Sequence, residues 1–391
     1  MSASSFPAPA ATLDLPGTFV LESGARLPSV RVAYRTWGRL DEHGGNAVLV
    51  CHALTGSADV DRWWSALLGP GRALDPERDF VVCSNVLGGC YGTTGPTSPR
   101  PDGRPWGAAF PDVSVRDIVR VQARLLAELG VRRLRLVIGG SLGGMQVLEW
   151  ALIFPDRVAA IAPIATSARH SAWQIAISET QRQAIAADPR FRGGHYPEDD
   201  PPAAGLAAAR QVAMWSYRSR ESLDARFGRE RGADGRYAVL AWLDHHGRAL
   251  VERFDANSYV TLTKAMDTHD VGRGRGGWRE ALAAVAAPAL VVSIDSDVLY
   301  PPLEQDQLAT ALPDARLVTL SSPHGHDAFL IEEAAVNALV RDFREEVAAR
   351  EAGPRSSQTT RASSVRGDER AAASGARPGA AGHRGEQPWQ V

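Results

Sequence analysis

LRLVIGGSLGG, residues 134–144, contains the clearest structural signal in the chain. An apolar run, Leu134–Ile138, leads directly into a glycine-flanked serine, and a helical pattern, Leu142–Phe154, begins at the next residue. A G-x-S-x-G sequence between a strand and a helix forms a sharp turn that exposes the serine hydroxyl at the strand end. Glycines are needed there because a side chain would clash with so tight a turn. Ser141 is therefore the candidate nucleophile of an enzyme.

Five further apolar runs of strand length are bounded by turn residues, and helical patterns lie between several of them. Continuous apolar runs are typical of a parallel sheet that is covered on both faces. Right-handed crossovers would place the helices on both faces. The pattern predicts an α/β fold with a doubly wound, mostly parallel sheet. Strands are predicted at Ala47–Cys51, Phe80–Ser84, Leu134–Ile138, Val158–Ile164, Ala289–Ile294 and Arg316–Leu320, and helices at Val115–Leu129, Leu142–Phe154 and Glu332–Val347.

The strand pattern is interrupted at residues 167–280, where helical segments occur without clear strands. Examples are Trp173–Ala186, Leu206–Trp215 and Ser258–Met266. We interpret residues 167–280 as an inserted helical lid, and residues 15–166 and 281–349 as the α/β core. Residues 1–14 and 350–391 are rich in small residues and cannot bury much apolar surface, so we predict that both ends are disordered.

Composition favours small-molecule partners. The chain has 391 residues and a formal net charge of −2, too weak a field to favour nucleic acid or a membrane surface. We find no N-terminal targeting pattern and no run near the roughly 18 apolar residues that span a bilayer, so a cytoplasmic protein is expected.

The cysteine and lysine counts exclude further classes of chemistry. Three cysteines cannot form a disulfide framework or a tetrahedral zinc site, and no metal is expected. Lys264 is the only lysine, which leaves little room for Schiff-base chemistry.

A serine hydroxyl is weakly nucleophilic and needs a general base. In the α/β-hydrolase fold, which uses this kind of turn, an orienting carboxylate and then a histidine follow the serine in the chain. Asp295 and Asp297 follow the predicted strand Ala289–Ile294, and His324 and His326 follow the next predicted strand. The pattern alone leaves both choices open.

The negative oxygen that forms during acyl transfer needs two backbone N–H donors. In this fold one donor is the residue after the nucleophile, here Leu142, and the other lies in a loop that follows an early strand. The segment His52–Gly56 directly follows the predicted strand Ala47–Cys51. We therefore predict Leu54 as the second donor.

Several longer sequence segments match those of one known family and occur in the same order along the chain. In these segments the chain resembles the homoserine O-acetyltransferase family of α/β-hydrolase acyltransferases, and the resemblance covers roughly Leu15 to Val347. The matching segments are Cys51-His52-Ala53-Leu54-Thr55-Gly56, Trp63-Trp64, Ser84-Asn85-Val86-Leu87-Gly88-Gly89-Cys90-Tyr91-Gly92-Thr93-Thr94-Gly95-Pro96, the turn at Gly140–Met145, Gln181-Arg182-Gln183-Ala184-Ile185, Phe254-Asp255-Ala256-Asn257-Ser258-Tyr259 and Gly325-His326-Asp327-Ala328-Phe329-Leu330.

The resemblance implies roles for four residues. Asp297 matches the family's catalytic acid and His326 its catalytic base. Arg210 matches the arginine that binds the substrate carboxylate, and Asp327 matches the acid that holds the substrate ammonium. These roles suit the residue types, because a guanidinium pairs bidentately with a carboxylate and a carboxylate accepts hydrogen bonds from an ammonium.

The resemblance also implies an activity, namely transfer of an acetyl group from acetyl-CoA to L-homoserine through an acetyl-Ser141 intermediate, in methionine biosynthesis. Acetyl-CoA would be a co-substrate, no cofactor would be bound permanently, and the protein would be a homodimer assembled through the lid. The alternatives are a serine O-acyltransferase, a succinyl-CoA user and a hydrolase of the same fold. A non-enzymatic binding module is disfavoured because every position of the triad holds a competent residue.

Overall fold

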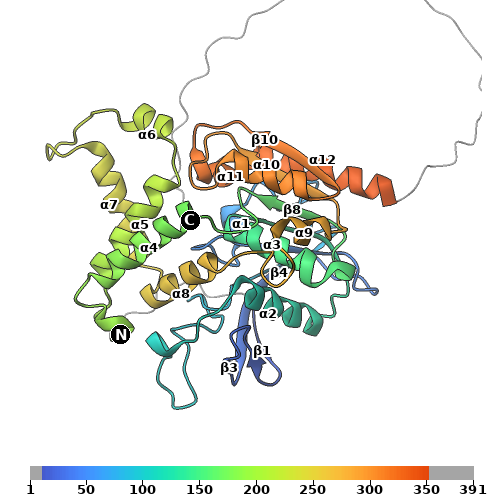
Figure 1. Ribbon diagram of the computed structural model, residues 1–391, viewed down its shortest axis with the longest axis horizontal. Helices are drawn as coiled ribbons and strands as arrows, with labels where there is room; N and C mark the ends of the chain where they lie inside the picture. Colours follow the sequence, from blue (N-terminus) through green and yellow to red (C-terminus); the bar gives the residue numbers. More distant parts are fainter. Residues whose placement is uncertain (1–10, 352–391) are drawn as a thin grey trace, which may run out of the picture.

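The computed structural model describes residues 11–351 and contains one eight-stranded sheet (Figure 1). The strand order is β1-β4-β6-β5-β7-β8-β9-β10. Strands β5 to β10 run parallel, whereas β4 is antiparallel to both β1 and β6. The predicted α/β fold with a mostly parallel sheet is confirmed. The strands are β1 (Ala11–Leu15), β4 (Val30–Trp37), β5 (Ala47–Cys51), β6 (Phe80–Ser84), β7 (Leu134–Gly140), β8 (Ile161–Ile164), β9 (Ala289–Ile294) and β10 (Ala315–Leu320), with β2 (Phe19–Val20) and β3 (Arg26–Leu27) in a separate hairpin.

Helices cover both faces of the sheet. Alternate residues of a strand point to opposite faces, so each central strand contributes to two apolar clusters. On β5, Val48 and Val50 pack with α12, while Ala47 and Leu49 pack with α2 and α3. The core helices are α1 (Val60–Trp63), α2 (Val115–Glu128), α3 (Leu142–Ile153), α9 (Trp278–Ala283), α10 (Pro302–Ala311), α11 (Ala328–Ile331) and α12 (Glu333–Glu351), and the 3₁₀ turns are η1 (Gly107–Ala109), η2 (Pro155–Arg157), η3 (Arg192–Gly194) and η4 (Gly325–Asp327).

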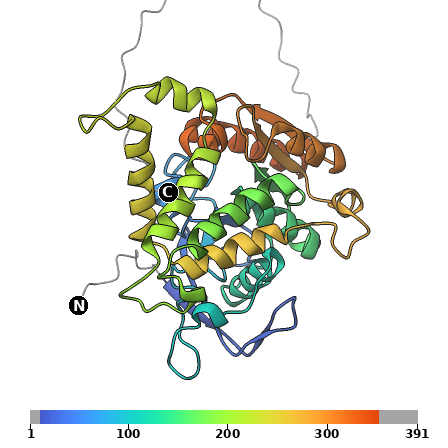
Figure 2. The same cartoon turned by 60° about the vertical axis from the view of Figure 1, so that its left-hand side comes forward.

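The lid segment lies between β8 and β9 in the chain. Its helices gather on one side of the molecule, drawn green to yellow in Figures 1 and 2. Helix α4 packs against α5 and α8, and α5 packs against α7. The helices are α4 (Ala172–Ala186), α5 (Ala203–Ser216), α6 (Arg220–Phe227), α7 (Ala238–Val251) and α8 (Ala256–Asp267). Among residues 11–351 we find no helix that is both long and apolar enough to cross a membrane.

Two predicted boundaries are wrong by a few residues. Residues 11–14, predicted to be disordered, belong to β1, which pairs with β4 from Ala11 opposite Tyr34 to Leu15 opposite Val30. The short sequence ATLDL alternates between covered and exposed side chains, a strand pattern that its small residues obscure. Helix α12 extends to Glu351, past the predicted start of the tail. The remainder of both predicted ends, residues 1–10 and 352–391, lies outside the described residues.

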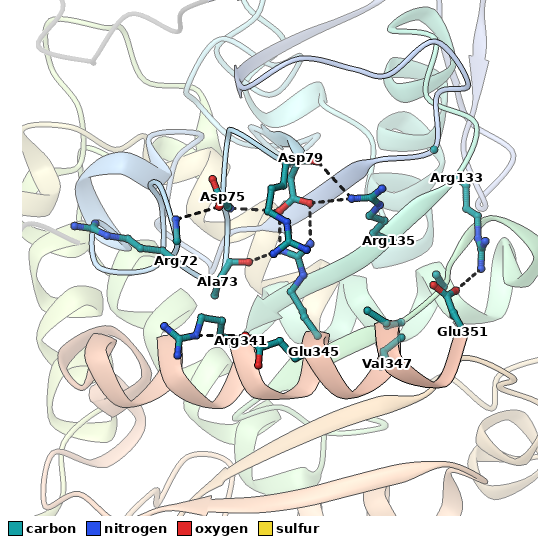
Figure 3. Close-up of a pocket in the computed structure, with 17 residues that line it drawn as sticks. Arg72, Ala73, Asp75, Asp79, Arg133, Arg135, Arg341, Glu345, Val347 and Glu351 are labelled. Atoms are coloured by element: carbon teal, nitrogen blue, oxygen red, sulfur yellow. Dashed lines mark hydrogen bonds and ion pairs between the residues drawn. The ribbon is translucent and has the colours of Figure 1, made fainter. Parts of the chain in front are cut away.

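A group of ion pairs joins α12 to the sheet at the amino ends of β6 and β7, around a cavity of about 750 Å³. Figure 3 shows Asp79 facing α12, and Arg344 of that helix pairs with the Asp79 carboxylate. Its two guanidinium nitrogens lie 2.6 and 2.7 Å from the two carboxylate oxygens, and Arg135 lies 3.7 Å from the same carboxylate. The Asp79 side chain is 1% exposed and that of Arg344 is 20% exposed. Bidentate pairing of this kind is the strong form of an ion pair.

We expect Asp79→Ala to lower the free energy of unfolding by about 2 to 4 kcal/mol, because Arg344 is left without its carboxylate in a mostly buried place. Chemical denaturation measures this difference. Asp314→Ala is the matched control, since Asp314 pairs with Arg350 of the same helix but both side chains are more than half exposed. That control should lose no more than about 1 kcal/mol. Equal losses in the two variants would show that burial does not strengthen the Asp79 pair.

Candidate active site

Ser141 stands on the sharp turn between β7 and α3. Its φ of 58° lies in the left-handed region, which is strained for a residue with a side chain. The turn is also tight, because a Cβ on Gly139 would lie 2.5 Å from the carbonyl oxygen of Cys51 and one on Gly143 only 2.1 Å from it. Glycine is therefore required at both positions. The turn that the sequence predicts is present, and it presents Ser141 at the carboxyl end of the strand.

Asp297 and His326 form a buried pair beside this turn. The Nδ1 of His326 lies 2.7 Å from one carboxylate oxygen of Asp297, and each residue is 3% exposed. The other carboxylate oxygen accepts hydrogen bonds from the backbone N–H groups of Leu299 and Tyr300, at 2.8 and 2.9 Å. A carboxylate can only accept, so Nδ1 carries the proton and Nε2 of a neutral His326 is available as a base.

The Nε2 atom of His326 is buried and makes no hydrogen bond to another atom of the described residues. It lines the same pocket as Ser141. An unpaired acceptor in a polar pocket is costly unless a substrate or water meets it. The arrangement is that of a base held ready for a hydroxyl proton.

Asp295 and His324, which the pattern could not separate from Asp297 and His326, lie outside this arrangement. The Asp295 carboxylate accepts from the Ser321 hydroxyl at 2.7 Å and from the Ser322 backbone at 3.1 Å. The hydrogen bond from Ser321 is the main reason that the pKa of Asp295 lies below its usual value. Asp295 therefore ties together two loops at the sheet edge, while Nδ1 of His324 lies 3.4 Å from the Ser222 hydroxyl.

Of the two predicted oxyanion donors, Leu54 lines this pocket and Leu142 directly follows Ser141 in the chain. Leu142 is the first residue of α3, and the first N–H of a helix has no acceptor within the helix. Leu54 lines the pocket from the loop after β5. His52 fixes that loop, because its Nε2 accepts from the backbone of Val86 at 3.2 Å and its Nδ1 therefore donates to the carbonyl of Ala53 at 2.8 Å. Burial lowers the pKa of His52 to about 4, which keeps this ring neutral.

Gln146 ties the two donor segments together. Its side-chain nitrogen lies 3.2 Å from the carbonyl oxygen of His52 and 3.1 Å from that of Leu142. Its side-chain oxygen accepts from Gln122 at 2.8 Å, and Gln122 in turn accepts from Trp150 at 2.8 Å. Gln146 is fully buried. One amide group thus sets the distance between the loop of Leu54 and the start of α3.

We expect Gln146→Leu to lower kcat by roughly 10- to 100-fold, because one oxyanion donor is worth about 3 to 4 kcal/mol and a displaced donor loses part of that. Steady-state kinetics under saturating substrate measures the change. Gln122→Leu is the matched control, since it breaks the same buried chain without touching either donor segment. A similar loss of kcat in both variants would assign the effect of Gln146 to general destabilisation.

Four residues from the end of α5 and the turn after it reach the same pocket. Arg210, Met214, Tyr217 and Arg218 all line it, together with Asp327 and His246. Arg210 is 5% exposed; its NH1 lies 3.4 Å from the Thr55 hydroxyl, and its guanidinium lies 5.7 Å from the centre of the Tyr217 ring. Burial raises the pKa of Tyr217 to about 12, so its phenol keeps its proton. The predicted substrate arginine therefore faces the pocket of Ser141 rather than solvent.

Asp327 lines the pocket, and its carboxylate is paired with a neighbouring arginine. One of its carboxylate oxygens lies 3.2 Å from Nε of Arg218, and its backbone N–H donates to the carbonyl of Tyr217 at 3.2 Å. Arg218 and Tyr217 were not among the predicted site residues. Tyr217 and Arg218 follow Arg210 by seven and eight residues, about two turns of a helix, so helical periodicity alone could have placed them on the face of Arg210.

Comparison with known proteins decides the family. Residues 46–333 match the family model described as the alpha/beta hydrolase fold. The homoserine O-acetyltransferase of Trichormus variabilis is 59% identical over 333 residues, which cover 85% of this chain and 92% of that relative. The chain belongs to the homoserine O-acetyltransferase family. The resemblance seen in the sequence is thus confirmed, and so is the α/β-hydrolase fold.

Solved structures show how widely the fold of this family is used. The crystal structure of homoserine O-acetyltransferase from Bacillus anthracis gives a TM-score of 0.79 at 25% identity, over 85% of this chain and 97% of that one. The structure of esterase E22 gives a TM-score of 0.80 at 26% identity, over 85% of this chain and 99% of that one. Because an acetyltransferase and an esterase match about equally well, the fold itself leaves the acyl acceptor open.

Proposed function

We propose that this protein transfers the acetyl group of acetyl-CoA to the hydroxyl of L-homoserine through an acetyl-Ser141 intermediate. The observation that carries the proposal is one pocket lined by Ser141 and His326 and also by two charged side chains, Arg210, which is buried, and Asp327, which is partly buried. The first two residues suit covalent acyl transfer, and the last two suit an acceptor that carries a carboxylate and an ammonium.

In the first step His326 removes the Ser141 proton as the serine oxygen attacks the thioester carbonyl. The backbone N–H groups of Leu54 and Leu142 hold the negative oxygen of the tetrahedral intermediate. When the intermediate collapses, the carbon–sulfur bond breaks and the thiolate takes the proton from His326. Asp297 stabilises the imidazolium that exists between these events. The products are coenzyme A and acetyl-Ser141.

In the second step His326 removes the proton of the homoserine hydroxyl, which attacks the acetyl-serine carbonyl. The bond to the Ser141 oxygen breaks, and that oxygen takes the proton back from His326. Arg210 pairs with the substrate carboxylate and Asp327 accepts from the ammonium. A carboxylate can accept several hydrogen bonds, so Asp327 can serve the ammonium while it stays paired with Arg218.

The main rival is a hydrolase, in which water takes the place of homoserine. Arg210 argues against it, because a buried guanidinium in the reaction pocket has a use for an amino-acid carboxylate and none for water. The 59% identity to an acetyltransferase, against 26% to esterase E22, points the same way.

The test is a thiol-release assay with acetyl-CoA and succinyl-CoA, each with homoserine, serine or no acceptor. We expect fast release only from acetyl-CoA with homoserine. Equal release with and without an acceptor would make the protein a hydrolase. A preference for serine or for succinyl-CoA would retain the mechanism and change the substrate.

We also propose that the protein is cytoplasmic and that two copies of the chain associate through their lids to form a homodimer. Several large apolar side chains of the lid helices are more than a third exposed, namely those of Trp173, Ile175, Trp215 and Leu240. Exposed apolar groups that gather on one part of a protein favour association. Sedimentation should give the mass of two chains, and Trp215→Glu should shift it toward one. A single-chain mass for the unaltered protein would contradict the proposal.

A further inference from the structure

The loop that carries His326 is bound by a turn of the lid. We refer to residues 321–327, between β10 and α11, as the base loop, and to residues 217–219, between α5 and α6, as the lid turn. The Ser219 hydroxyl donates to the carbonyl of Pro323 at 2.5 Å. These two residues are 104 positions apart in the chain, so the contact joins the lid to the core.

A second hydrogen bond holds the base loop on the other side of His326. The backbone N–H of Asp327 donates to the carbonyl of Tyr217 at 3.2 Å. Together with the contact from Ser219, it binds the backbone three residues before His326 and one residue after it. The ring of Tyr217 also lies against that of His326, with the ring centres 5.6 Å apart. The lid turn therefore contacts the imidazole itself as well as the backbone that carries it.

Gly325 allows the two backbones to approach this closely. Its φ is 67°, and a Cβ there would lie 2.7 Å from the backbone nitrogen of Ser219 and 2.8 Å from the carbonyl oxygen of Tyr217. Any other residue would be strained and would push the base loop away from the lid turn. The backbone N–H of Gly325 donates to the hydroxyl of Ser296 at 2.9 Å, and Ser296 precedes Asp297 in the chain. The base loop is thus held between the lid turn and the loop that carries Asp297.

The Ser219 hydroxyl is buried and has two partners. The residue is 1% exposed, and its side-chain oxygen accepts from the backbone N–H of Ser222 at 3.0 Å, which caps the start of α6. A hydroxyl has one proton to donate, and here that proton goes to Pro323. Ser219 is not among the residues that line the reaction pocket. Any effect of this side chain on the reaction must therefore pass through the base loop or through α6.

We propose that Ser219 is a positioning residue for His326. The Asp297 carboxylate orients the imidazole ring, and the hydrogen bond from Ser219 keeps the backbone of the base loop where His326 reaches the pocket of Ser141. A base must lie within hydrogen-bond reach of the proton that it removes, and a displacement of about 1 Å can cost roughly 100-fold in rate. The inference rests on the proposed function only in taking Ser141 as the nucleophile and His326 as its base.

The experiment measures how fast Ser141 reacts with phenylmethylsulfonyl fluoride. The bond from Oγ to sulfur forms, the sulfur–fluorine bond breaks, and His326 takes the serine proton. This reaction needs neither acetyl-CoA nor homoserine, so it reports on the base whatever the acyl acceptor is. We expect Ser219→Ala to slow it about 10-fold, the scale of one lost hydrogen bond. Ser219→Thr keeps the hydroxyl and should restore the rate to within about 3-fold of the unaltered value.

Two further variants separate the hydrogen bond to Pro323 from the helix cap. Glycine caps a helix nearly as well as serine but has no hydroxyl to donate, so Ser219→Gly should be as slow as Ser219→Ala. Ser114→Ala removes another buried capping serine, at the start of α2, which does not line the reaction pocket. It should react at the unaltered rate. A fast Ser219→Gly or a slow Ser114→Ala would assign the loss to helix stability and overturn the proposal.

The two half-reactions give a second readout. His326 moves a proton in both, so Ser219→Ala should slow the burst of thiol release from acetyl-CoA and the decay of acetyl-Ser141 by similar factors, about 10-fold each. The homoserine concentration that gives half the maximal decay rate should stay within about 2-fold of the unaltered value. A slower decay alone, with a higher homoserine requirement, would place the effect in the acceptor pocket and overturn the proposal. Labelling of a residue other than Ser141 would overturn the nucleophile assignment of the proposed function, a result that is read from the unaltered protein and not from the Ser219 variants.

Discussion

Ser141→Ala is expected to lower acyl-transfer turnover by about 10⁶-fold, the scale of losing the nucleophile of a catalytic triad. The alanine leaves His326 with no hydroxyl to activate, and the oxyanion donors alone support only a small residual rate. Thiol release from acetyl-CoA in the presence of homoserine measures the loss. Ser293→Ala is a suitable control, because Ser293 is also buried, on β9 of the same sheet, but does not line the pocket. It should retain activity within a few-fold.

The covalent intermediate gives the same variant a second test. Unaltered protein mixed with acetyl-CoA alone and quenched rapidly should carry one acetyl group on the peptide that contains Ser141. The alanine variant should carry none. An unmodified Ser141, together with kinetics that require both substrates to be bound at once, would exclude the two-step route and leave Ser141 with a different part in the reaction.

The sharp turn that carries Ser141 could be predicted from sequence because every element that shapes it is local. The strand, the glycines and the helix occupy adjacent positions, and the close approach to Cys51 only adds to the need for glycine. The choice between Asp295 and Asp297, in contrast, depends on contacts with residues far away in the sequence. Asp295 is bound by Ser321 and Ser322, 26 and 27 residues further on, and no local pattern shows which of two aspartates a distant loop will bind. The family resemblance supplied that choice, and the geometry agrees with it.

The strands of the sheet also differ in whether local sequence predicts them. The central strands, such as β5 and β9, are covered on both faces, so each appears as an unbroken apolar run. β4 mixes buried and exposed residues in VRVAYRTW, and β1 has one buried residue in ATLDL, so neither resembles the central strands. Both lie toward one edge of the sheet and run antiparallel to a neighbour. Such strands are stabilised by pairing partners that a scan for buried runs does not detect.

The hydrogen bonds that connect Arg182 through Asp267 and His170 to Tyr300 could not be predicted from sequence at all. These residues come from the start of the lid, from α4, from the end of α8 and from the loop after β9, and no two of them are neighbours in the chain. Each alone has an ordinary explanation, such as a helix-surface arginine or a core tyrosine. Only the distances between them show a continuous set of hydrogen bonds.

Arg210→Ala is expected to lower kcat/KM for homoserine by roughly 30- to 4,000-fold, corresponding to about 2 to 5 kcal/mol for one partner lost from a buried charge pair. The substrate carboxylate would enter a closed pocket without its bidentate partner. Acylation of Ser141 by acetyl-CoA should continue at nearly the unaltered rate, because the thioester carbonyl does not contact the carboxylate clamp. Arg210→Lys should recover only part of the loss, since a point charge does not reproduce the planar fork.

Separating the two half-reactions makes the Arg210 prediction decisive. The burst of thiol release from acetyl-CoA alone reports acylation, and the decay of acetyl-Ser141 after homoserine is added reports acceptor binding and transfer. For Arg210→Ala the burst should remain, and the homoserine concentration that gives half the maximal decay rate should rise. A variant that lost the burst but kept the decay and its dependence on homoserine would place Arg210 in the coenzyme A site. Asp327 would then be the remaining evidence for an amino-acid acceptor, and its carboxylate is already paired with Arg218.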